Sequence, residues 1–156
     1  MSNFESAPRV SPFLWFNDNA EDAVNFYISI FKNSRRVGEL LHDGNTPGPK
    51  GTPLTIAFEL DGQRITALNG GPMYKFSEAI SFVIRCDNQD EVDYYWERLT
   101  SGGTDIQCGW LKDKFGVTWQ VVPAKIGELI KSPKAMQAMM KMVKLDIAEL
   151  ERAAKE

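Results

Sequence analysis

The chain has 156 residues, of which 43% are hydrophobic, and this is enough to bury a substantial core. Its 18 basic and 21 acidic residues are mixed along the sequence, so neither nucleic acid nor an anionic lipid surface is an expected partner. No stretch approaches the roughly 18 continuous apolar residues of a membrane span. The polar residues 1–9 contain no apolar signal sequence, and we expect a cytoplasmic protein with no membrane partner.

An internal repeat organises most of the chain. The segment that begins Phe13-Leu-Trp-Phe-Asn-Asp resembles the one that begins Phe82-Val-Ile-Arg-Cys-Asp, at a constant offset of 69 residues without a gap. In each copy an Asp-Asn pair follows the apolar run and precedes apolar residues at helical spacing. Glu21 and Glu91 are placed to close a capping box in their respective copies. Each copy therefore predicts a strand followed by a capped helix.

After its helix, the first copy contains three strand-like runs, at residues 36–41, 54–60 and 64–68. Asp61-Gly62 is the expected hairpin turn between the last two runs. The Gly- and Pro-rich residues 43–53 predict a long flexible loop. The single histidine, His42, lies at the edge of that loop, where we expect it to be solvated. The predicted order is βαβββ.

The second copy predicts the same order less completely. Strand-like runs lie near residues 80–86, 105–111 and 117–122, and Gly102-Gly103 ends the helix between the first two. A turn is expected around Asp113 to Gly116. One strand of this copy cannot be placed from the sequence.

The two copies together predict an α+β fold of two βαβββ modules. We expect a single domain over residues 1–156, with module one at about 11–76, module two at about 79–123 and a C-terminal helical tail at 124–156. The tail pattern predicts a short helix through residues 126–130 and then one long helix that begins after Ser132.

Four of the six methionines lie between residues 136 and 142 of this tail. Their spacing favours a stripe that faces the core, where methionine fills irregular gaps. A lid over a ligand and a dimer surface are the alternatives.

Strand alternation separates two faces in each module. Phe82, Ile84 and Cys86 form an apolar set that should face the helix, and the parity of Trp15 and Trp119 predicts helix-facing core positions for them too. The mixed sets, together with Thr66 and Leu68, should line a concave side that holds a ligand or water. A wet groove of no function is the alternative. These mixed sets contain Ser81, Val83 and Arg85 on one strand and Thr118, Gln120 and Val122 on another.

Several segments resemble one known family. The run from Cys108-Gly109-Trp110 to Trp119-Gln120-Val121-Val122-Pro123, the opening Pro12-Phe-Leu-Trp-Phe and the tail Lys144-Leu-Asp-Ile-Ala-Glu-Leu resemble the PhnB-like family. This family belongs to the glyoxalase, bleomycin-resistance and extradiol-dioxygenase superfamily, and its members carry the description 3-demethylubiquinone-9 3-methyltransferase. The resemblance covers about residues 11–154. It implies a vicinal-oxygen-chelate fold, in which two βαβββ modules curl around a cavity that is often completed in a homodimer.

In the metal-using branches of this superfamily, four side chains at quasi-symmetric strand positions hold one divalent ion. The internal repeat places those positions at Pro12, Thr66, Ser81 and Gln120, which make a poor cage for a cation. We therefore expect no metal and no other cofactor. A metal-dependent lyase, isomerase or dioxygenase would need substitute ligands such as Glu59 or Asp113.

The resemblance and the missing cage favour a protein that binds a small organic ligand, with cavity candidates Thr66, Ser81, Arg85, Trp110 and Gln120. Trp110 either stacks on a flat ligand or closes the cavity. No catalytic residue is predicted, and whether the protein is an enzyme stays open. Cys86 and Cys108 are expected to be reduced and mostly buried, and Cys108 has no evident base to activate it.

A methyltransferase is disfavoured on the residues. A doubly wound S-adenosylmethionine enzyme needs a glycine-rich turn between a strand and a helix. Gly70-Gly71 is followed directly by Pro72, and Gly102-Gly103 ends a helix, so neither pair forms such a turn.

Overall fold

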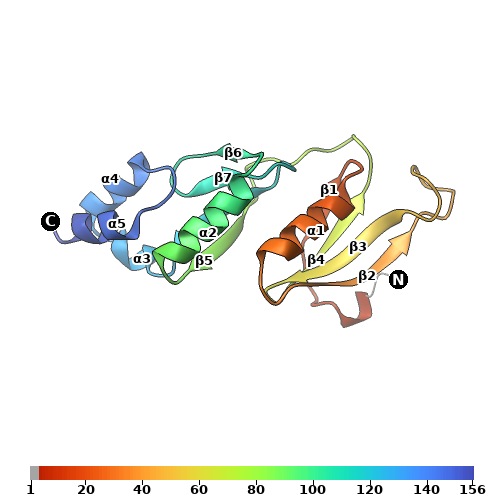
Figure 1. Cartoon of the computed structure of the whole chain (residues 1–156), viewed down its shortest axis with the longest axis horizontal. Coiled ribbons are helices and arrows are strands. Elements are labelled where there is room, and N and C mark those ends of the chain that lie inside the picture. The colour runs from red at the N-terminus through yellow and green to blue at the C-terminus, as the bar shows by residue number, and fades with distance from the viewer. Residues whose placement is uncertain (1–3) are drawn as a thin grey trace. The chain divides into compact units, whose positions relative to one another are not determined.

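The computed structural model describes residues 4–156 and contains two compact units (Figure 1). Unit one ends at Lys75, and unit two comprises Phe76–Glu156. Each unit contains one four-stranded mixed sheet and one helix across it, in the order βαβββ. The predicted α+β fold of two βαβββ modules is therefore confirmed, and the predicted tail is part of unit two.

Unit one has the strand order β1-β4-β3-β2, in which β1 runs parallel to β4 and the other neighbours are antiparallel. The three strands after the helix match the predicted runs to within one residue at each end. Its elements are a short 3-10 turn (Phe4–Ser6), β1 (Phe13–Phe16), α1 (Ala20–Ile30), β2 (Arg35–Leu41), β3 (Pro53–Leu60) and β4 (Gln63–Asn69).

The core of unit one lies between α1 and one face of its sheet. Tyr27 of α1 stacks on Phe58 of β3 with ring centroids 6.5 Å apart, and both side chains are buried. Because alternate strand residues share a face, the register places the neighbours of Phe58 on the same side. These helix-facing residues are all buried: Leu14, Phe16, Ile56, Ile65 and Ala67.

The start of α1 is capped from a distance. Asn19 stands at the N-cap but its side chain makes no capping bond. Instead, Ala20 N donates to Oδ1 of Asn69, at the end of β4, over 2.9 Å. Glu21, which was expected to close a capping box, pairs with Arg36 at 3.2 Å. The local cap predicted for this helix is therefore wrong, because a residue 49 positions away accepts the bond.

Unit two has the strand order β5-β8-β7-β6, again with one parallel pair, β5 and β8. The continuous strand predicted over residues 105–111 is wrong. It is two short strands, because Cys108 (φ 63°) and Gly109 (φ 82°) turn the chain in the left-handed region. This break supplies the strand that the sequence left unplaced. The elements are β5 (Phe82–Cys86), α2 (Gln89–Thr100), β6 (Thr104–Asp105), β7 (Trp110–Lys112) and β8 (Thr118–Pro123).

The N-cap predicted at Asn88 for the second helix is confirmed, and Glu91 bonds one residue earlier than in a capping box. Oδ1 of Asn88 accepts from Glu91 N at 2.9 Å, and Oε1 of Glu91 accepts from Asp87 N at 2.9 Å. The helix-facing side of the sheet packs under Val92, Trp96 and Leu99 of α2, which are buried. Its own buried residues are Ile84, Cys86, Leu111, Trp119 and Val121.

The tail contains α3 (Ile126–Leu129), α4 (Pro133–Lys141) and α5 (Ile147–Ala154), so the single long final helix is wrong. The carbonyls of Met142 and Val143 accept hydrogen bonds from Cys108 N and Gly109 N, at 2.9 and 2.7 Å. These bonds attach the segment between α4 and α5 to the turn before β7, and Leu145 of this segment is fully buried. The methionine stripe of α4 is half-buried or exposed, while its buried residue is Ala135.

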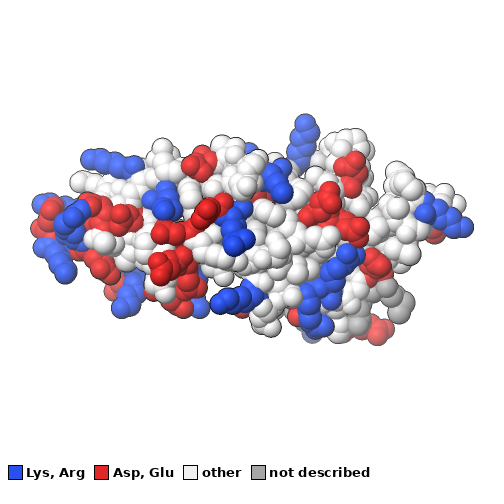
Figure 2. Space-filling view, in the orientation of Figure 1, with Lys and Arg blue, Asp and Glu red and all other residues white. Residues whose placement is uncertain are grey.

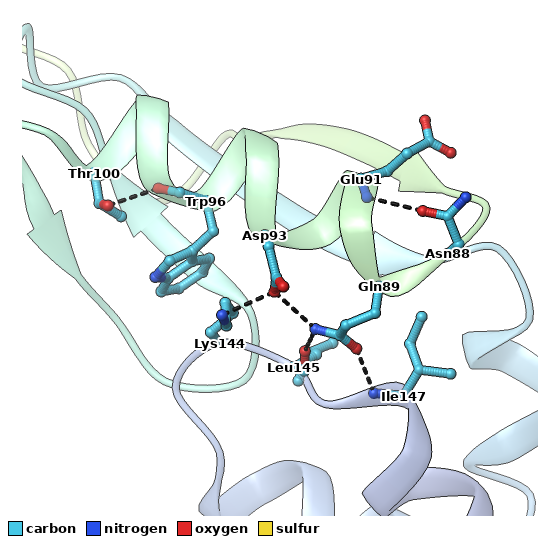
Figure 3. A network of polar contacts seen from close by, with 9 residues as sticks. All are labelled: Asn88, Gln89, Glu91, Asp93, Trp96, Thr100, Lys144, Leu145 and Ile147. Carbon is cyan, nitrogen blue, oxygen red and sulfur yellow. Dashed lines mark hydrogen bonds and ion pairs between the residues drawn. The ribbon is translucent and has the colours of Figure 1, made fainter.

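Gln89 of α2 holds the segment between α4 and α5 (Figure 3). Its Nε2 donates to the Leu145 carbonyl at 3.1 Å, and its Oε1 accepts from Ile147 N at 2.9 Å. Asp93, one helical turn later, accepts from Gln89 and pairs with Lys144 at 2.8 Å.

Among residues 4–156, no helix has the length and apolar content needed to cross a membrane.

Candidate functional site

The sheet of unit two has one face that α2 does not cover, and most of the predicted cavity residues lie on it. We call this the open face of unit two, with strand residues Val83, Arg85, Trp110, Gln120 and Val122. The register aligns Trp110 of β7, Gln120 of β8 and Val83 of β5 in one row across three strands. Val83 is 60% exposed, whereas Ile84, on the helix-facing side, is 8% exposed.

Two of the predicted residues are in direct contact. Nε2 of Gln120 donates to Oγ of Ser81 over 2.9 Å, and both side chains are half-buried. Within the described part of the chain, Oε1 of Gln120 has no partner. The contact with Ser81 therefore orients the amide and leaves one acceptor and one N–H for another molecule.

The other two candidates of unit two lie close by in the register. Trp110 is half-buried at the start of β7 and is the cross-strand neighbour of Gln120. Arg85 stands opposite Val122, and its exposed guanidinium pairs with Asp87 at 2.7 Å. An exposed pair of this kind contributes little to stability, so Arg85 can exchange its partner at small cost.

Thr66 belongs to the sheet of unit one, where it lies on the face away from α1. Its register neighbours are Phe13 on β1 and Ala57 on β3. Thr66 is 3% exposed and Phe13 is 50% exposed. Trp15 lies on this same face, so its predicted helix-facing position is wrong. Its ring is instead held by a hydrogen bond from Nε1 to the Gly71 carbonyl, 2.9 Å, and by an edge contact with Tyr74.

The error over Trp15 comes from the repeat offset. The helix-facing residues Leu14 and Phe16 correspond to Ile84 and Cys86, an offset of 70 (84−14 and 86−16), whereas both helices begin at an offset of 69 (89−20). One residue is therefore lost between strand and helix in the second copy. The counterpart of Ser81 becomes Ser11 instead of Pro12. Thr66, beside Phe13, remains the counterpart of Gln120, beside Val83.

The donor groups do not fit a divalent cation. Thr66, Ser81 and Gln120 offer neutral oxygens, while such sites are built from carboxylates, imidazoles or thiolates. The proposed substitutes are engaged elsewhere: Glu59 pairs with Arg35 at 3.3 Å, and Asp113 accepts from the indole of Trp119 at 2.9 Å. In the described residues 4–156, no three His, Cys, Asp or Glu side chains are grouped to hold a metal.

The sequence assigned Thr118 and Val83 to the mixed sets without naming them as cavity candidates, and it misjudged His42. Thr118, on the open-face parity, is 1% exposed and its hydroxyl has no partner in the described chain. Val83 adds apolar area that strand alternation had already assigned to the mixed set. His42 was expected to be solvated but is 4% exposed. The histidine is buried because the loop folds back: His42 N donates to the Thr52 carbonyl at 2.8 Å.

Neither thiol has the surroundings of a nucleophile. Burial raises the pKa of Cys86 to about 12, and the charges of Glu91 and Asp87 act in the same direction. Cys108 is half-buried in the turn before β7, where its backbone N–H donates to the Met142 carbonyl of the tail. Structural roles therefore suit both cysteines.

The comparisons with known proteins agree with this geometry. Residues 8–122 match the model of the family described as 3-demethylubiquinone-9 3-methyltransferase. A PhnB protein from Bacillus cereus, described as a candidate enzyme of that name, is 32% identical with a TM-score of 0.69, and its whole length aligns with 75% of this chain. A search of curated proteins gives no match.

More distant solved structures show the fold alone. Protein PA1353 from Pseudomonas aeruginosa has 20% identity and a TM-score of 0.61, and 98% of its length aligns with 75% of this chain. The fosfomycin resistance protein FosX from Listeria monocytogenes, solved with Mn(II) and sulfate, has 16% identity and a TM-score of 0.54. That alignment covers 98% of FosX and 84% of this chain.

Proposed function

This chain belongs to the family described as 3-demethylubiquinone-9 3-methyltransferase, a PhnB-like branch of the vicinal-oxygen-chelate superfamily, and we propose that it binds a small organic molecule without a metal ion. The row Trp110–Gln120–Val83 on the open face of unit two is the observation that carries this proposal. Ligand sites combine apolar walls with a few oriented polar groups. Here Trp110 and Val83 supply the walls, and Gln120, held by Ser81, supplies the oriented group.

The row favours a flat ligand. The indole of Trp110 offers a face for stacking, and the free Oε1 and second N–H of the Gln120 amide fix the orientation of the ligand by hydrogen bonds. Arg85, whose exposed pair with Asp87 is weak, suits a negative charge at one end of the ligand. Thr66 is the corresponding candidate on the sheet of unit one.

The methyltransferase chemistry of the family description has little support in these residues. Gly70 and Gly71 follow β4 and lead to Pro72 without a helix, while Gly102 and Gly103 follow α2. Neither pair makes the strand-to-helix turn that binds a nucleotide cofactor in doubly wound enzymes. A titration with labelled S-adenosylmethionine tests this point, and stoichiometric binding would contradict the proposal.

A fluorescence titration with 1-anilinonaphthalene-8-sulfonate, an aromatic anion with a flat naphthalene ring, tests the open face. We expect Trp110→Ala to weaken binding about ten-fold and Gln120→Ala about five-fold. Tyr94→Ala is the matched control, because Tyr94 is a partly exposed aromatic residue of α2. Equal binding by Trp110→Ala and the wild type would show that the probe binds elsewhere.

Metal independence needs its own measurement. We expect no bound metal by elemental analysis of protein purified without chelator, and no rise in Tm with nickel, cobalt, zinc, manganese or magnesium ions. A stoichiometric ion, or a rise that Gln120→Ala abolishes, would favour the metal-dependent lyase or dioxygenase of the same superfamily.

We also propose that the protein forms a homodimer. Phe13 is 50% exposed and Val83 60% exposed on the uncovered sheet faces, and apolar side chains of this size favour burial against another surface. Light scattering after size exclusion measures the mass directly. A mass of 17.6 kDa at micromolar concentration would refute the dimer.

A further inference from the structure

Unit one contains a cavity of about 440 Å³ that has no part in the open face described above. It lies between the start of α1 and the loop of residues 42–52, which joins β2 to β3. Its polar lining comes from Asn17, Asp18 and Glu21 near the start of α1, from His42 and Thr52 at the two ends of the loop, and from Asn69 at the end of β4. Prolines of the loop form much of the remaining wall.

His42 is fixed in this wall by its surroundings. Its backbone N–H donates to the Thr52 carbonyl, and its own carbonyl accepts from Gly51 N at 2.9 Å. Nδ1 of the ring lies 2.7 Å from Oγ1 of Thr46. The ring edge packs against Gly48, where a Cβ would come within 2.6 Å of Nε2. The loop is therefore folded around the imidazole, and its glycine makes room for it.

Nε2 is the remaining polar atom of this ring. It has no hydrogen-bond partner among the described residues. Among the described residues, the fully buried side-chain atoms without a partner are the hydroxyls of Thr55 and Thr118, so Nε2 of His42, a residue that lines the cavity, is not completely enclosed. Because His42 as a whole is only 4% exposed, Nε2 has little contact with bulk water and favours a partner that enters the cavity.

The cavity lining carries an excess of negative charge. Asp18 is exposed and has no partner in the described chain, whereas Glu21 pairs with Arg36, which also pairs with Glu39 at 2.9 Å. No lysine or arginine lines the cavity. The N-terminus of α1 adds roughly half a positive charge, which is less than the charge of Asp18. Figure 2 shows acidic side chains at this end of α1 on the face in view.

We propose that this cavity is a binding site for a small organic monocation, of the alkylammonium or guanidinium class. The cation pairs with Asp18, and its N–H groups donate to Glu21 and to Nε2 of His42, which accepts when Nδ1 donates to Thr46. The alkyl part of the ligand packs on Pro47 and Pro49. This site is separate from the open face of unit two and does not depend on a ligand there.

The single histidine of the chain makes a direct test possible, because its ring signals in a ¹H–¹³C NMR spectrum belong to His42 alone. The protein is titrated with n-butylammonium chloride and, separately, with sodium butyrate at the same ionic strength and pH. We expect the cation to shift the His42 signals saturably and the anion to leave them unchanged. Equal shifts with both probes, or no saturable shift with the cation, would overturn the proposal.

Asp18→Asn and Asp61→Asn form a matched pair of variants. Each removes one exposed carboxylate of unit one, and asparagine tolerates the left-handed backbone of Asp61, φ 48°. We expect Asp18→Asn to weaken butylammonium binding about five-fold, as for the loss of one partly solvated charge pair, and Asp61→Asn to leave it unchanged. Equal weakening by both variants would mean that the cation responds only to net charge, and would refute a site at Asp18. Unchanged Tm values would show that both variants are folded.

Discussion

The two units reach the same βαβββ order by different means, and the turn before the last strand shows this well. In unit one, β3 and β4 pair over six consecutive residues, and a two-residue turn at Asp61-Gly62 is exposed. In unit two, β7 pairs with β8 over three residues only. There Asp113 is buried, and its carboxylate accepts from Phe115 N, Val117 N and the indole of Trp119. Hydrogen bonds to the Asp113 side chain thus stabilise this turn, where the strands share few backbone hydrogen bonds.

The helix starts differ in the same way. α2 is capped by its own residues, Asn88 and Glu91, whereas α1 depends on Asn69 at the end of β4. A similar Asp-Asn pair precedes both helices. Equivalent sequences therefore do not ensure equivalent hydrogen bonds. In unit one, Asn69 at the end of the neighbouring strand β4 accepts from the first N–H of α1, and in unit two the cap comes from the helix's own residues.

The largest expected effect separates the two turns. Asp113→Asn should lower the free energy of unfolding by about 2 kcal/mol, because the new amide nitrogen meets the N–H of Trp119 in a buried position. Asp61→Asn, at the exposed turn, should change it by less than about 0.5 kcal/mol. Urea denaturation of the two variants measures both values. Similar losses would mean that the ladder, and not Asp113, stabilises the turn of unit two.

The caps should give an intermediate effect. Asn88→Ala should cost about 1 kcal/mol, and Asn69→Ala about 1–2 kcal/mol because it removes bonds to Ala20 N and to the Pro53 carbonyl. Asn19→Ala should cost less than about 0.5 kcal/mol, since that side chain makes no capping bond. Thermal unfolding of the three variants measures the order. A cost for Asn19→Ala equal to that of Asn88→Ala would show that α1 is capped locally after all.

The smallest expected effect concerns the tail, which only unit two has. The hydrogen bond from Lys144, and then that from Gln89, lower the pKa of Asp93 below its ordinary value of 3.8. A lowered pKa in the folded state stabilises the protein above about pH 4, and this contribution is lost as the pH falls through the folded pKa. Since both side chains are more than a third exposed, we expect only a few tenths of a kcal/mol.

Lys144→Gln tests this linkage. At pH 7 the variant should be slightly less stable than the wild type, and the difference should shrink as the pH falls through the lowered pKa of Asp93. Lys131→Gln, which breaks the exposed pair with Glu128 in the same tail, is the control for general charge effects. A difference for Lys144→Gln that stays constant from pH 7 to the lowest pH at which the protein is folded would assign the effect to packing of the lysine stem.

The sequence predicted the parts of the fold that depend on local pattern. Strand alternation located β2, β3 and β4, and the Asp-Asn pair located both helices, because these signals lie within each element. The sequence predicted neither the break of the strand at Cys108-Gly109 nor the end of α4 at Lys141. They stabilise one another through two backbone hydrogen bonds, which no local pattern reveals.

The candidate site was predicted in part for the same reason. The repeat assigned Thr66 and Gln120 to equivalent positions, and alternation placed Ser81, Arg85 and Gln120 on one face. Trp15 was misplaced because a single lost residue between strand and helix inverts the parity of a whole strand. His42 was misjudged because its burial depends on Gly48 and Thr46 folding back over it, and composition had suggested only a flexible loop.

The irregular pairing of β2 affects how copies of the chain meet. As an edge strand, β2 has a row of backbone groups to which a strand from another molecule could add. Its register with β3 shifts twice, between Arg36 and Gly38 and between Leu40 and Leu41. Charged Arg35, Arg36 and Glu39 stand along it. Bulges and charges oppose strand addition, so this edge resists the sheet-to-sheet growth that leads to aggregation.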